Sequence, residues 1–208
     1  MANYEKASDH IEKSIAILER RCIETAINLL KNYCNRGITY YEHHKYEKAI
    51  EEFDRCVKLG EQMCNEGKLS SEEVVIVERE LVKSLMNRAV VYEFIDKHKE
   101  ALSDKSNCIE IWERMKNKGI LDDENNLAKV YMNRGVTYKL LTEYEKAQAD
   151  FKKSIEIWKQ MKKENKVIDE EAYAGALTLM NNKLLEYSSL DLDYSKSDDV
   201  KKIISNRK

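Results

Sequence analysis

Apolar side chains recur along the chain every three or four positions, which is the spacing of one face of an α-helix. The pattern is clear in residues 109–115 (Ile-Glu-Ile-Trp-Glu-Arg-Met) and again in residues 155–161 (Ile-Glu-Ile-Trp-Lys-Gln-Met). Because the spacing is helical rather than alternating, it predicts an all-α protein. The absence of proline and the presence of only six glycines agree with long helices.

Short polar segments between these stretches supply the signals that end one helix and begin the next. The predicted ends lie at residues 65–67 (Asn-Glu-Gly), 117–119 (Asn-Lys-Gly) and 164–166 (Glu-Asn-Lys). Acidic N-terminal signals follow at residues 70–73 (Ser-Ser-Glu-Glu), 122–124 (Asp-Asp-Glu) and 169–171 (Asp-Glu-Glu).

A block of similar sequence recurs at intervals that are typical of repeat proteins. Tyr-Glu-Lys-Ala occurs at residues 4–7, 46–49 and 144–147, and weaker copies occur at 98–101 and 194–197. The last residues of these blocks are separated by steps of 42, 52, 46 and 50 residues. An Asn-Arg block precedes three of them, at residues 35–40, 87–92 and 133–138. We therefore expect each unit to be a helix A that holds the Asn-Arg block, a short turn, and a helix B that begins at Tyr-Glu-Lys-Ala.

Small residues stand at the same place in every unit, where two helices can approach closely. They are Gly37, Ala89 and Gly135 on helix A and Ala49, Ala101 and Ala147 on helix B. Phe53 and Phe151 come one turn after their small residues, whereas Lys105 takes that place in the middle unit. We expect looser packing there, or a lysine whose aliphatic stem lies along the seam.

The spacing Asn-x-Gly-x-x-Tyr, Tyr-x-x-Ala, Phe and a small residue resembles the tetratricopeptide repeat. The match is densest at residues 30–59 and 128–157, and the copy at 176–206 is degenerate. The family repeat commonly has 34 residues and a proline that closes helix B; here Glu61, Glu113 and Lys159 take the place of that proline. We infer B helices that are longer by about two turns, which accounts for repeats of about 42–52 residues. The resemblance implies a right-handed α-solenoid of stacked antiparallel helix pairs.

The whole chain, residues 1–208, is expected to form one helical repeat domain. An unpaired N-terminal B helix is expected at residues 1–21. Three helix pairs are expected at 22–66, 70–118 and 122–166, and a degenerate last pair or cap at 169–208.

The resemblance also implies that the A helices form a concave wall on which one asparagine per repeat hydrogen-bonds the main chain of a bound peptide. The equivalent residues here are Asn35, Asn87, Asn133 and Asn181. An amide side chain offers both a donor and an acceptor to a peptide unit. The competing interpretation is a set of solvated surface asparagines, or of asparagines that hydrogen-bond within the repeat.

Lys31, Lys83 and Lys129 each lie four residues before one of these asparagines, on the same helix face. This stripe would favour an acidic peptide or a terminal carboxylate; the alternative is that they are ordinary surface lysines. A subgroup of the family binds chaperone C-termini through five clamp residues. Asn87 and Lys129 match that clamp, but the other sites hold Cys34, Ile38 and Asn133, so clamp function is not expected.

Composition excludes several classes of function. Lys plus Arg is 36 and Asp plus Glu is 38, and a net charge of −2 argues against nucleic-acid binding. No apolar run approaches the ~20 residues of a membrane span, and no secretory signal is recognisable at the N-terminus. Five cysteines without a CxxC pair are expected to be reduced, apolar core residues of a cytoplasmic protein. The adjacent His43 and His44 do not form a metal-binding pattern.

No phosphate-binding loop or nucleophile-plus-base pattern is present, so neither an enzyme nor a cofactor is expected. The leading hypothesis is a non-enzymatic module that binds an extended segment of a protein partner through the asparagines and lysines. The alternative is a structural, self-associating scaffold that uses the long B helices with Trp112 and Trp158. A nucleic-acid-binding helical repeat is a third possibility, and the charge argues against it.

Overall fold

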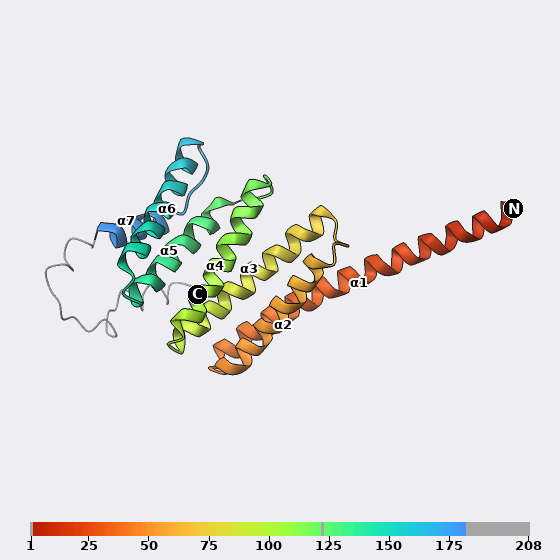
Figure 1. Ribbon diagram of the computed structural model, residues 1–208, viewed down its shortest axis with the longest axis horizontal. Coiled ribbons are helices and arrows are strands. Elements are labelled where there is room, and N and C mark those ends of the chain that lie inside the picture. Colours follow the sequence, from red (N-terminus) through yellow and green to blue (C-terminus); the bar gives the residue numbers. More distant parts are fainter. Residues whose placement is uncertain (1, 122, 182–208) are drawn as a thin grey trace.

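The helices follow one another as antiparallel hairpins in the computed structural model, which describes residues 2–121 and 123–181, with the backbone alone for 2–19. Their bounds are α1 (Ala2–Glu42), α2 (Tyr46–Asn65), α3 (Ser71–Phe94), α4 (His98–Asn117), α5 (Glu124–Leu140), α6 (Tyr144–Lys163) and α7 (Glu170–Asn181). The predicted all-α solenoid is confirmed (Figure 1).

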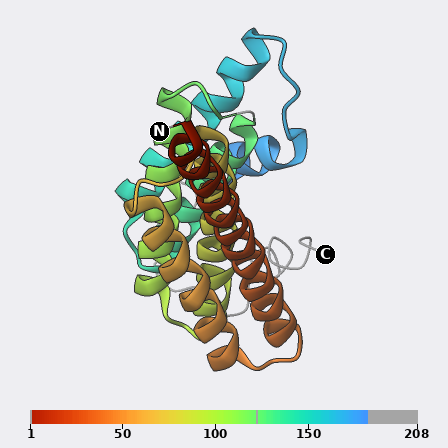
Figure 2. The ribbon, with the colours of Figure 1, turned by 90° about the vertical axis from the view of Figure 1, so that its right-hand side faces the viewer.

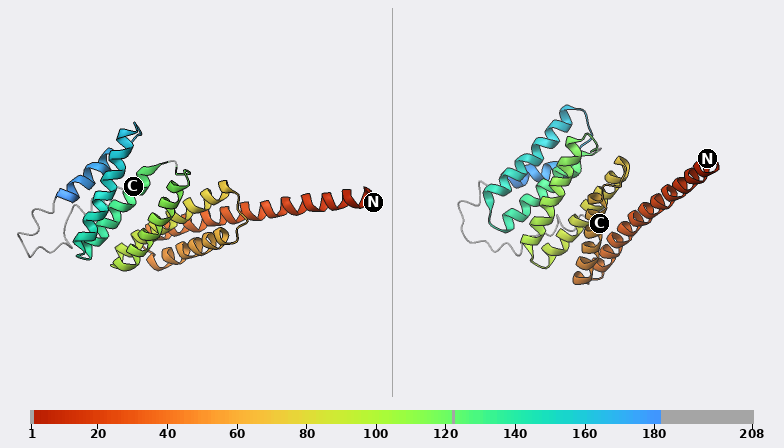
Figure 3. Two further views of the ribbon diagram at one scale, coloured as in Figure 1. Left: turned by 45° about the horizontal axis from the view of Figure 1, so that its top comes forward. Right: turned by 45° about the vertical axis from the view of Figure 1, so that its right-hand side comes forward.

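The helices form two layers. Each helix packs against the next one along the chain, and α1 also contacts α3. Helices α2, α4 and α6 lie on the side turned to the viewer in Figure 1, and the edge-on view in Figure 2 shows α1 on the opposite side from α2. We call α1, α3, α5 and α7 the A layer and α2, α4 and α6 the B layer. The two views in Figure 3 show the same order of hairpins.

The predicted helix starts and ends fall where the sequence signals place them. Ser70 accepts a hydrogen bond from the Glu73 amide, and the Glu73 carboxylate in turn accepts one from the Ser70 amide, which forms a capping box. Gly67 and Gly119 leave the B helices with φ of 66° and 68°, and Asn165 does so with φ of 55°. These left-handed residues stop the helices in the absence of proline. Each B helix is 20 residues long, which confirms the predicted extension.

The turn between helix A and helix B has the same geometry in all three full repeats. His44, Asp96 and Thr142 each take a left-handed conformation, with φ of 56°, 59° and 60°. The following amide then donates to a carbonyl five residues earlier, as from Lys45 to Tyr40 at 2.9 Å. Three different non-glycine side chains thus keep the same turn conformation, and the same backbone hydrogen bond closes each turn.

The core lies between the two layers, at the seam that the repeats predict. Phe53 and Phe151 are 0% and 1% exposed, and each ring lies against the glycine of its own A helix. Trp112 and Trp158 are 7% and 0% exposed, so both indoles belong to the core and neither forms an exposed surface for self-association.

Lys105 is also part of the core, with 1% of its surface exposed. Its ammonium group forms an ion pair with Glu93 and donates to Thr137 Oγ1 at 2.7 Å and to the Asn133 carbonyl at 3.1 Å. The middle repeat thus replaces a phenylalanine with a buried and fully engaged cation, whose stem runs along the seam as expected.

The expected boundary near residue 21 is absent, because α1 runs as one helix through residues 1–21 and 22–42 apart from Met1. No proline or glycine occurs between Ala2 and Arg36, so nothing in that stretch removes a backbone donor or ends the helix. The N-terminal part of α1 extends beyond α2 and α3 in Figures 1 and 3. The expected last B helix and C-terminal cap lie outside the described residues.

Candidate functional site

The residue that follows each predicted site asparagine fixes helix A to helix B. Arg88 holds Asp104 through two nitrogens at 2.6 and 2.8 Å, and Arg134 holds Asp150 in the same way at 2.7 and 2.8 Å. Arg36 pairs with Glu52 at 2.5 Å. All three pairs span 16 residues, and each joins an A helix to its own B helix next to a predicted site asparagine.

The four asparagines differ in exposure. Asn35 and Asn181 are exposed, Asn87 is half-buried, and Asn133 is 8% exposed. Asn181 is the last residue of α7. The amides that are most open to a ligand are therefore those of Asn35 and, at the far end of the described chain, Asn181.

A small polar cluster connects α1 to α3. Lys83 Nζ lies 3.5 Å from Asn35 Oδ1, and Asn87 Nδ2 lies 3.8 Å from Cys34 Sγ. We call Cys34, Asn35, Lys83 and Asn87 the α1–α3 cluster. The cluster contains two of the predicted asparagines and one predicted lysine, and these residues come from the neighbouring helices α1 and α3.

The third lysine of the stripe is engaged elsewhere. Lys129 Nζ lies 2.6 Å from Asp169 Oδ2, just before α7. The Asp169 carboxylate also accepts a hydrogen bond from the Ala172 amide at 3.0 Å, and this bond together with Lys129 lowers the pKa of Asp169. Lys31 and Lys83 remain exposed and form no ion pair with the described residues. The two lysines of the stripe that have no ion pair in the described part of the chain therefore lie on α1 and α3.

The apolar residues around the asparagines are mostly covered. Cys34 is 0% exposed and Met132 is 9% exposed, whereas Ile38, Met86 and Val136 are partly buried against the core. These apolar side chains pack against the core, and those of Ile38, Met86 and Val136 remain partly exposed.

Two polar networks near the site were not expected as such from the sequence. In the first, Thr137 Oγ1 donates toward Glu93 at 2.7 Å and bridges it to Lys105 and Asn133. The sequence signal for this network was Lys105, which stands where the other two repeats have a phenylalanine. In the second, Asn125 Oδ1 accepts from Trp158 Nε1 and from the Asp169 amide, both at 2.9 Å, while its Nδ2 donates to the Val167 carbonyl at 3.0 Å.

Asn125 lies outside the repeated motif, which is why no sequence signal pointed to it. The equivalent position of the middle repeat is Arg79. There, the indole nitrogen of Trp112 has no hydrogen-bond partner in the described part of the chain. The second network is therefore specific to the junction of α5, α6 and α7.

Within residues 20–121 and 123–181, no group of three or more His, Cys, Asp or Glu side chains could hold a metal ion. Burial raises the pKa of the Cys34 thiol and raises that of Cys56 to about 11, so both stay protonated near neutral pH. None of the described helices has the length and apolar content needed to cross a membrane.

Comparisons with known proteins agree with this architecture. Family models described as tetratricopeptide repeats match residues 30–62 and 128–157. No curated protein matches the sequence. BtubC (BKLC) from P. vanneervenii is similar in structure, with a TM-score of 0.55 and 18% identity over 73% of this chain, and the match spans 53% of the BtubC chain.

The N-terminal domain of stress-induced protein-1 (STI-1) from C. elegans is similar as well, with a TM-score of 0.53 and 16% identity. That match covers 74% of this chain and 96% of the STI-1 domain. At these identities the likeness concerns the fold alone.

Proposed function

Because this chain belongs to the tetratricopeptide repeat family, whose members are protein-interaction modules, we propose that it binds an extended peptide segment of a partner protein along its A layer and catalyses no reaction. The observation that carries the proposal is the α1–α3 cluster, in which Lys83 lies beside Asn35 and Asn87 lies beside Cys34 on adjacent helices.

An amide can pair with a peptide unit whatever the side chain of the bound residue, so an asparagine ladder favours sequence-tolerant binding. Neighbouring helices are about 10 Å apart, and an extended peptide advances about 3.3 Å per residue. Successive asparagines would then meet roughly every third residue of the peptide. Asn35 and Asn87 contribute more than Asn133, because Asn133 is only 8% exposed.

The two exposed lysines without an ion pair among the described residues set the preference for acidic over neutral peptides. Lys31 and Lys83 are exposed on the same face as Asn35 and Asn87, and they would attract a carboxylate on the ligand. Lys129 contributes less, since Asp169 already neutralises it. The proposed ligand is therefore an acidic segment that lies mainly over α1, α3 and α5.

The test is binding of an array of extended peptides, acidic and neutral, to the wild-type chain and to a variant with Asn35→Ala, Asn87→Ala and Asn133→Ala. If each hydrogen bond contributes about 1 kcal/mol, the triple variant loses about 100-fold in affinity. Unchanged affinity would remove the asparagines from the mechanism. The matched control replaces the exposed asparagines of the B layer, Asn65, Asn107 and Asn117, by alanine and should bind like the wild type.

A second pair of variants tests the selectivity. Lys31→Gln combined with Lys83→Gln should abolish the preference for acidic over neutral peptides, whereas Lys129→Gln should keep it. Equal effects of the two changes would contradict the division of roles inferred from the Lys129–Asp169 pair.

A further inference from the structure

Three equivalent positions on the exposed faces of the first and last full B helices carry opposite charges. On α2 the sequence Asp54, Lys58 and Glu61 follows one helix face, and all three residues are exposed. The equivalent residues on α6, each 98 positions later, are Lys152, Glu156 and Lys159, which are also exposed. We call these sets the α2 stripe and the α6 stripe; every charge of one is inverted in the other.

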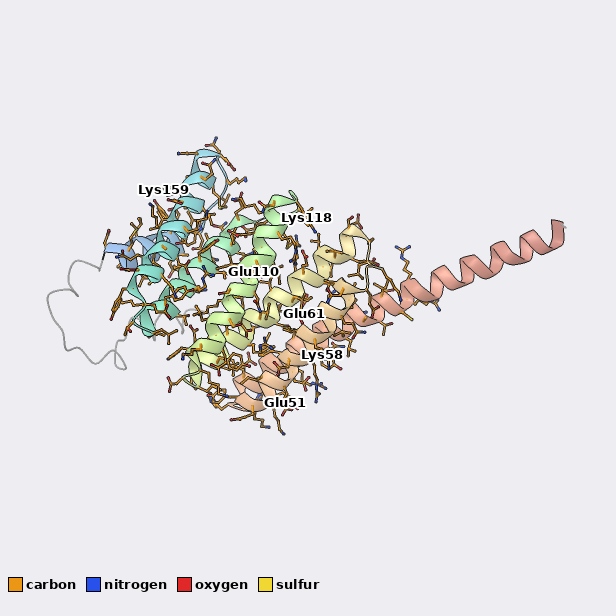
Figure 4. The ribbon with its side chains drawn as sticks, in the orientation of Figure 1. Glu51, Lys58, Glu61, Glu110, Lys118 and Lys159 are labelled. Atoms are coloured by element: carbon orange, nitrogen blue, oxygen red, sulfur yellow. The ribbon has the colours of Figure 1, made fainter. Side chains whose placement is uncertain are left out.

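Most of these charges have no partner within the described residues. Asp54 binds Arg88, but Lys58, Glu61, Lys152, Glu156 and Lys159 form no ion pair in residues 20–121 and 123–181. Figure 4 shows Lys58 and Glu61 on α2 and Lys159 on α6 projecting from the same layer. Helix α4 lies between α2 and α6, so the two stripes cannot meet within one molecule (Figures 1 and 4).

The middle B helix does not continue the pattern. Its equivalent residues are Ser106, Glu110 and Glu113. Ser106 accepts a hydrogen bond from Arg134, and Glu113 accepts one from the Tyr131 hydroxyl. Only Glu110 of the three is a free exposed charge, so α4 offers no alternating stripe to a neighbour.

We propose that the α2 stripe of one molecule binds the α6 stripe of a second copy of this chain. With the two helices parallel and in register, Asp54 faces Lys152, Lys58 faces Glu156, and Glu61 faces Lys159. The spacing of four and then three residues is identical in both stripes, so the pairs of Lys58 with Glu156 and of Glu61 with Lys159 form together. Asp54 already binds Arg88, so Lys152 is a second cation for it and contributes less. A slip of one helical turn places Asp54 opposite Glu156, and like charges then repel, so the signs select the register.

Exposed ion pairs are individually weak and are screened by salt, so this contact is weak and depends on ionic strength. It uses the B layer and leaves the A layer, with the α1–α3 cluster, open to a peptide. Self-association and peptide binding are therefore separate activities of separate surfaces, and the loss of one leaves the other in place.

The test is sedimentation velocity of the whole chain across concentrations of about 10 µM to 1 mM, a range suited to weak association. At low salt the weight-average mass should rise above the monomer mass of 24.4 kDa. Raising the salt from about 0.05 M to about 0.5 M should weaken the association by on the order of tenfold. A wild-type chain that stays monomeric at low salt overturns the proposal.

Charge reversal identifies the surfaces. Lys58→Glu with Glu61→Lys reverses the α2 stripe, and Glu156→Lys with Lys159→Glu reverses the α6 stripe; neither changes the net charge. Each reversal alone should give a monomer at all concentrations. An equimolar mixture of the two variants should associate again, because each then meets a complementary stripe. A mixture that stays monomeric, or a reversal that leaves the association unchanged, contradicts the stripe pairing.

The control for general charge effects is Lys99→Glu with Glu100→Lys, an exposed pair on α4 outside both stripes. This variant should associate like the wild type, and its monomerisation would show that the association is not confined to α2 and α6. Circular dichroism of all variants should match the wild type, since every changed side chain is exposed.

Discussion

The Phe53 ring lies directly on Gly37, where a Cβ atom would stand 2.6 Å from Phe53 Cε1. Gly135 and Phe151 repeat the relationship, with Cε1 of Phe151 at the same 2.6 Å. In the middle repeat the equivalent positions hold Ala89 and Lys105, and both residues are buried. A lysine stem is slimmer than a phenyl ring, which accounts for the methyl group at that position. The residue on helix A and the residue on helix B therefore change together, and the cause is steric.

Gly37→Ala should destabilise the protein by about 1–3 kcal/mol, because the added methyl group overpacks the seam against a fully buried ring. Urea unfolding measures the change. Gly175→Ala is the matched control: it is a helical glycine with no atom within 4 Å of the added Cβ, so alanine there should be neutral or slightly stabilising. Equal effects at the two positions would show that the ring contact does not matter.

Replacing Lys105 alone should lower the free energy of unfolding. Lys105→Met leaves the Glu93 carboxylate, whose side chain is 15% exposed, without its cation, and we expect a loss of about 3 kcal/mol. The triple change Ala89→Gly, Glu93→Tyr and Lys105→Phe copies the first repeat and should recover most of that loss. Thermal unfolding of the two variants makes the comparison, and a triple variant as unstable as Lys105→Met would contradict it.

Asn125→Ala should loosen α7 in particular. The substitution removes the acceptor of Trp158 Nε1 and of the Asp169 amide, and unsatisfied buried donors cost about 1–3 kcal/mol. Hydrogen exchange should speed up in α7 more than in α3. Asn126→Ala, at the exposed neighbouring position, should leave exchange in both helices unchanged.

Acid should weaken the start of α7 through Asp169. The pKa of this carboxyl is lowered by the Ala172 amide and by Lys129, so the stabilisation is present above its ordinary value of about 4 and is lost as the pH falls through the lowered value. Asp169→Asn removes the titrating group. Urea midpoints measured between pH ~5 and pH ~2 should therefore decline less steeply for this variant than for the wild type, and parallel curves would exclude the contribution.

Cysteine reactivity should follow burial. Burial raises the pKa of Cys34 and of Cys108, and raises that of Cys56 to about 11, whereas Cys22 is exposed. Iodoacetamide at pH ~8 should modify Cys22 first and leave the three buried thiols unmodified until the protein unfolds. Peptide mass spectrometry after timed quenching distinguishes them, and early modification of Cys108 would contradict the packing around it.

Much of the fold could be predicted because each repeat has helix-starting and helix-ending residues at equivalent positions. The starts at Ser70 and Asp123 and the left-handed ends at Gly67 and Gly119 are set by short-range chemistry. The close approach at Gly37 follows from the repeated spacing of small residues on the two helices. The break expected near residue 21 was the exception, because similarity to Tyr-Glu-Lys-Ala marked a repeat where no helix-ending residue occurs.

The candidate site was less predictable, because equivalent positions have unequal surroundings. Asn35 and Asn133 share a place in the repeat, yet one is exposed and the other is 8% exposed. Lys83 and Lys129 also correspond, but only Lys129 finds Asp169 at the start of the next helix. Asp123 stands before α5 at the position that Asp169 holds before α7, yet it forms no ion pair with Lys83 within the described residues. The repeat pattern therefore does not decide which of these pairs forms.

The unbroken course of α1 has a mechanical consequence. At 1.5 Å per residue, its 41 residues form a rod about 60 Å long. One half of that rod holds Cys34 and Asn35 beside α3, and the other half protrudes (Figure 3). A force applied to the protruding half acts as on a lever arm, so a partner that tilts it would change the spacing of Asn35 and Asn87 without touching either residue.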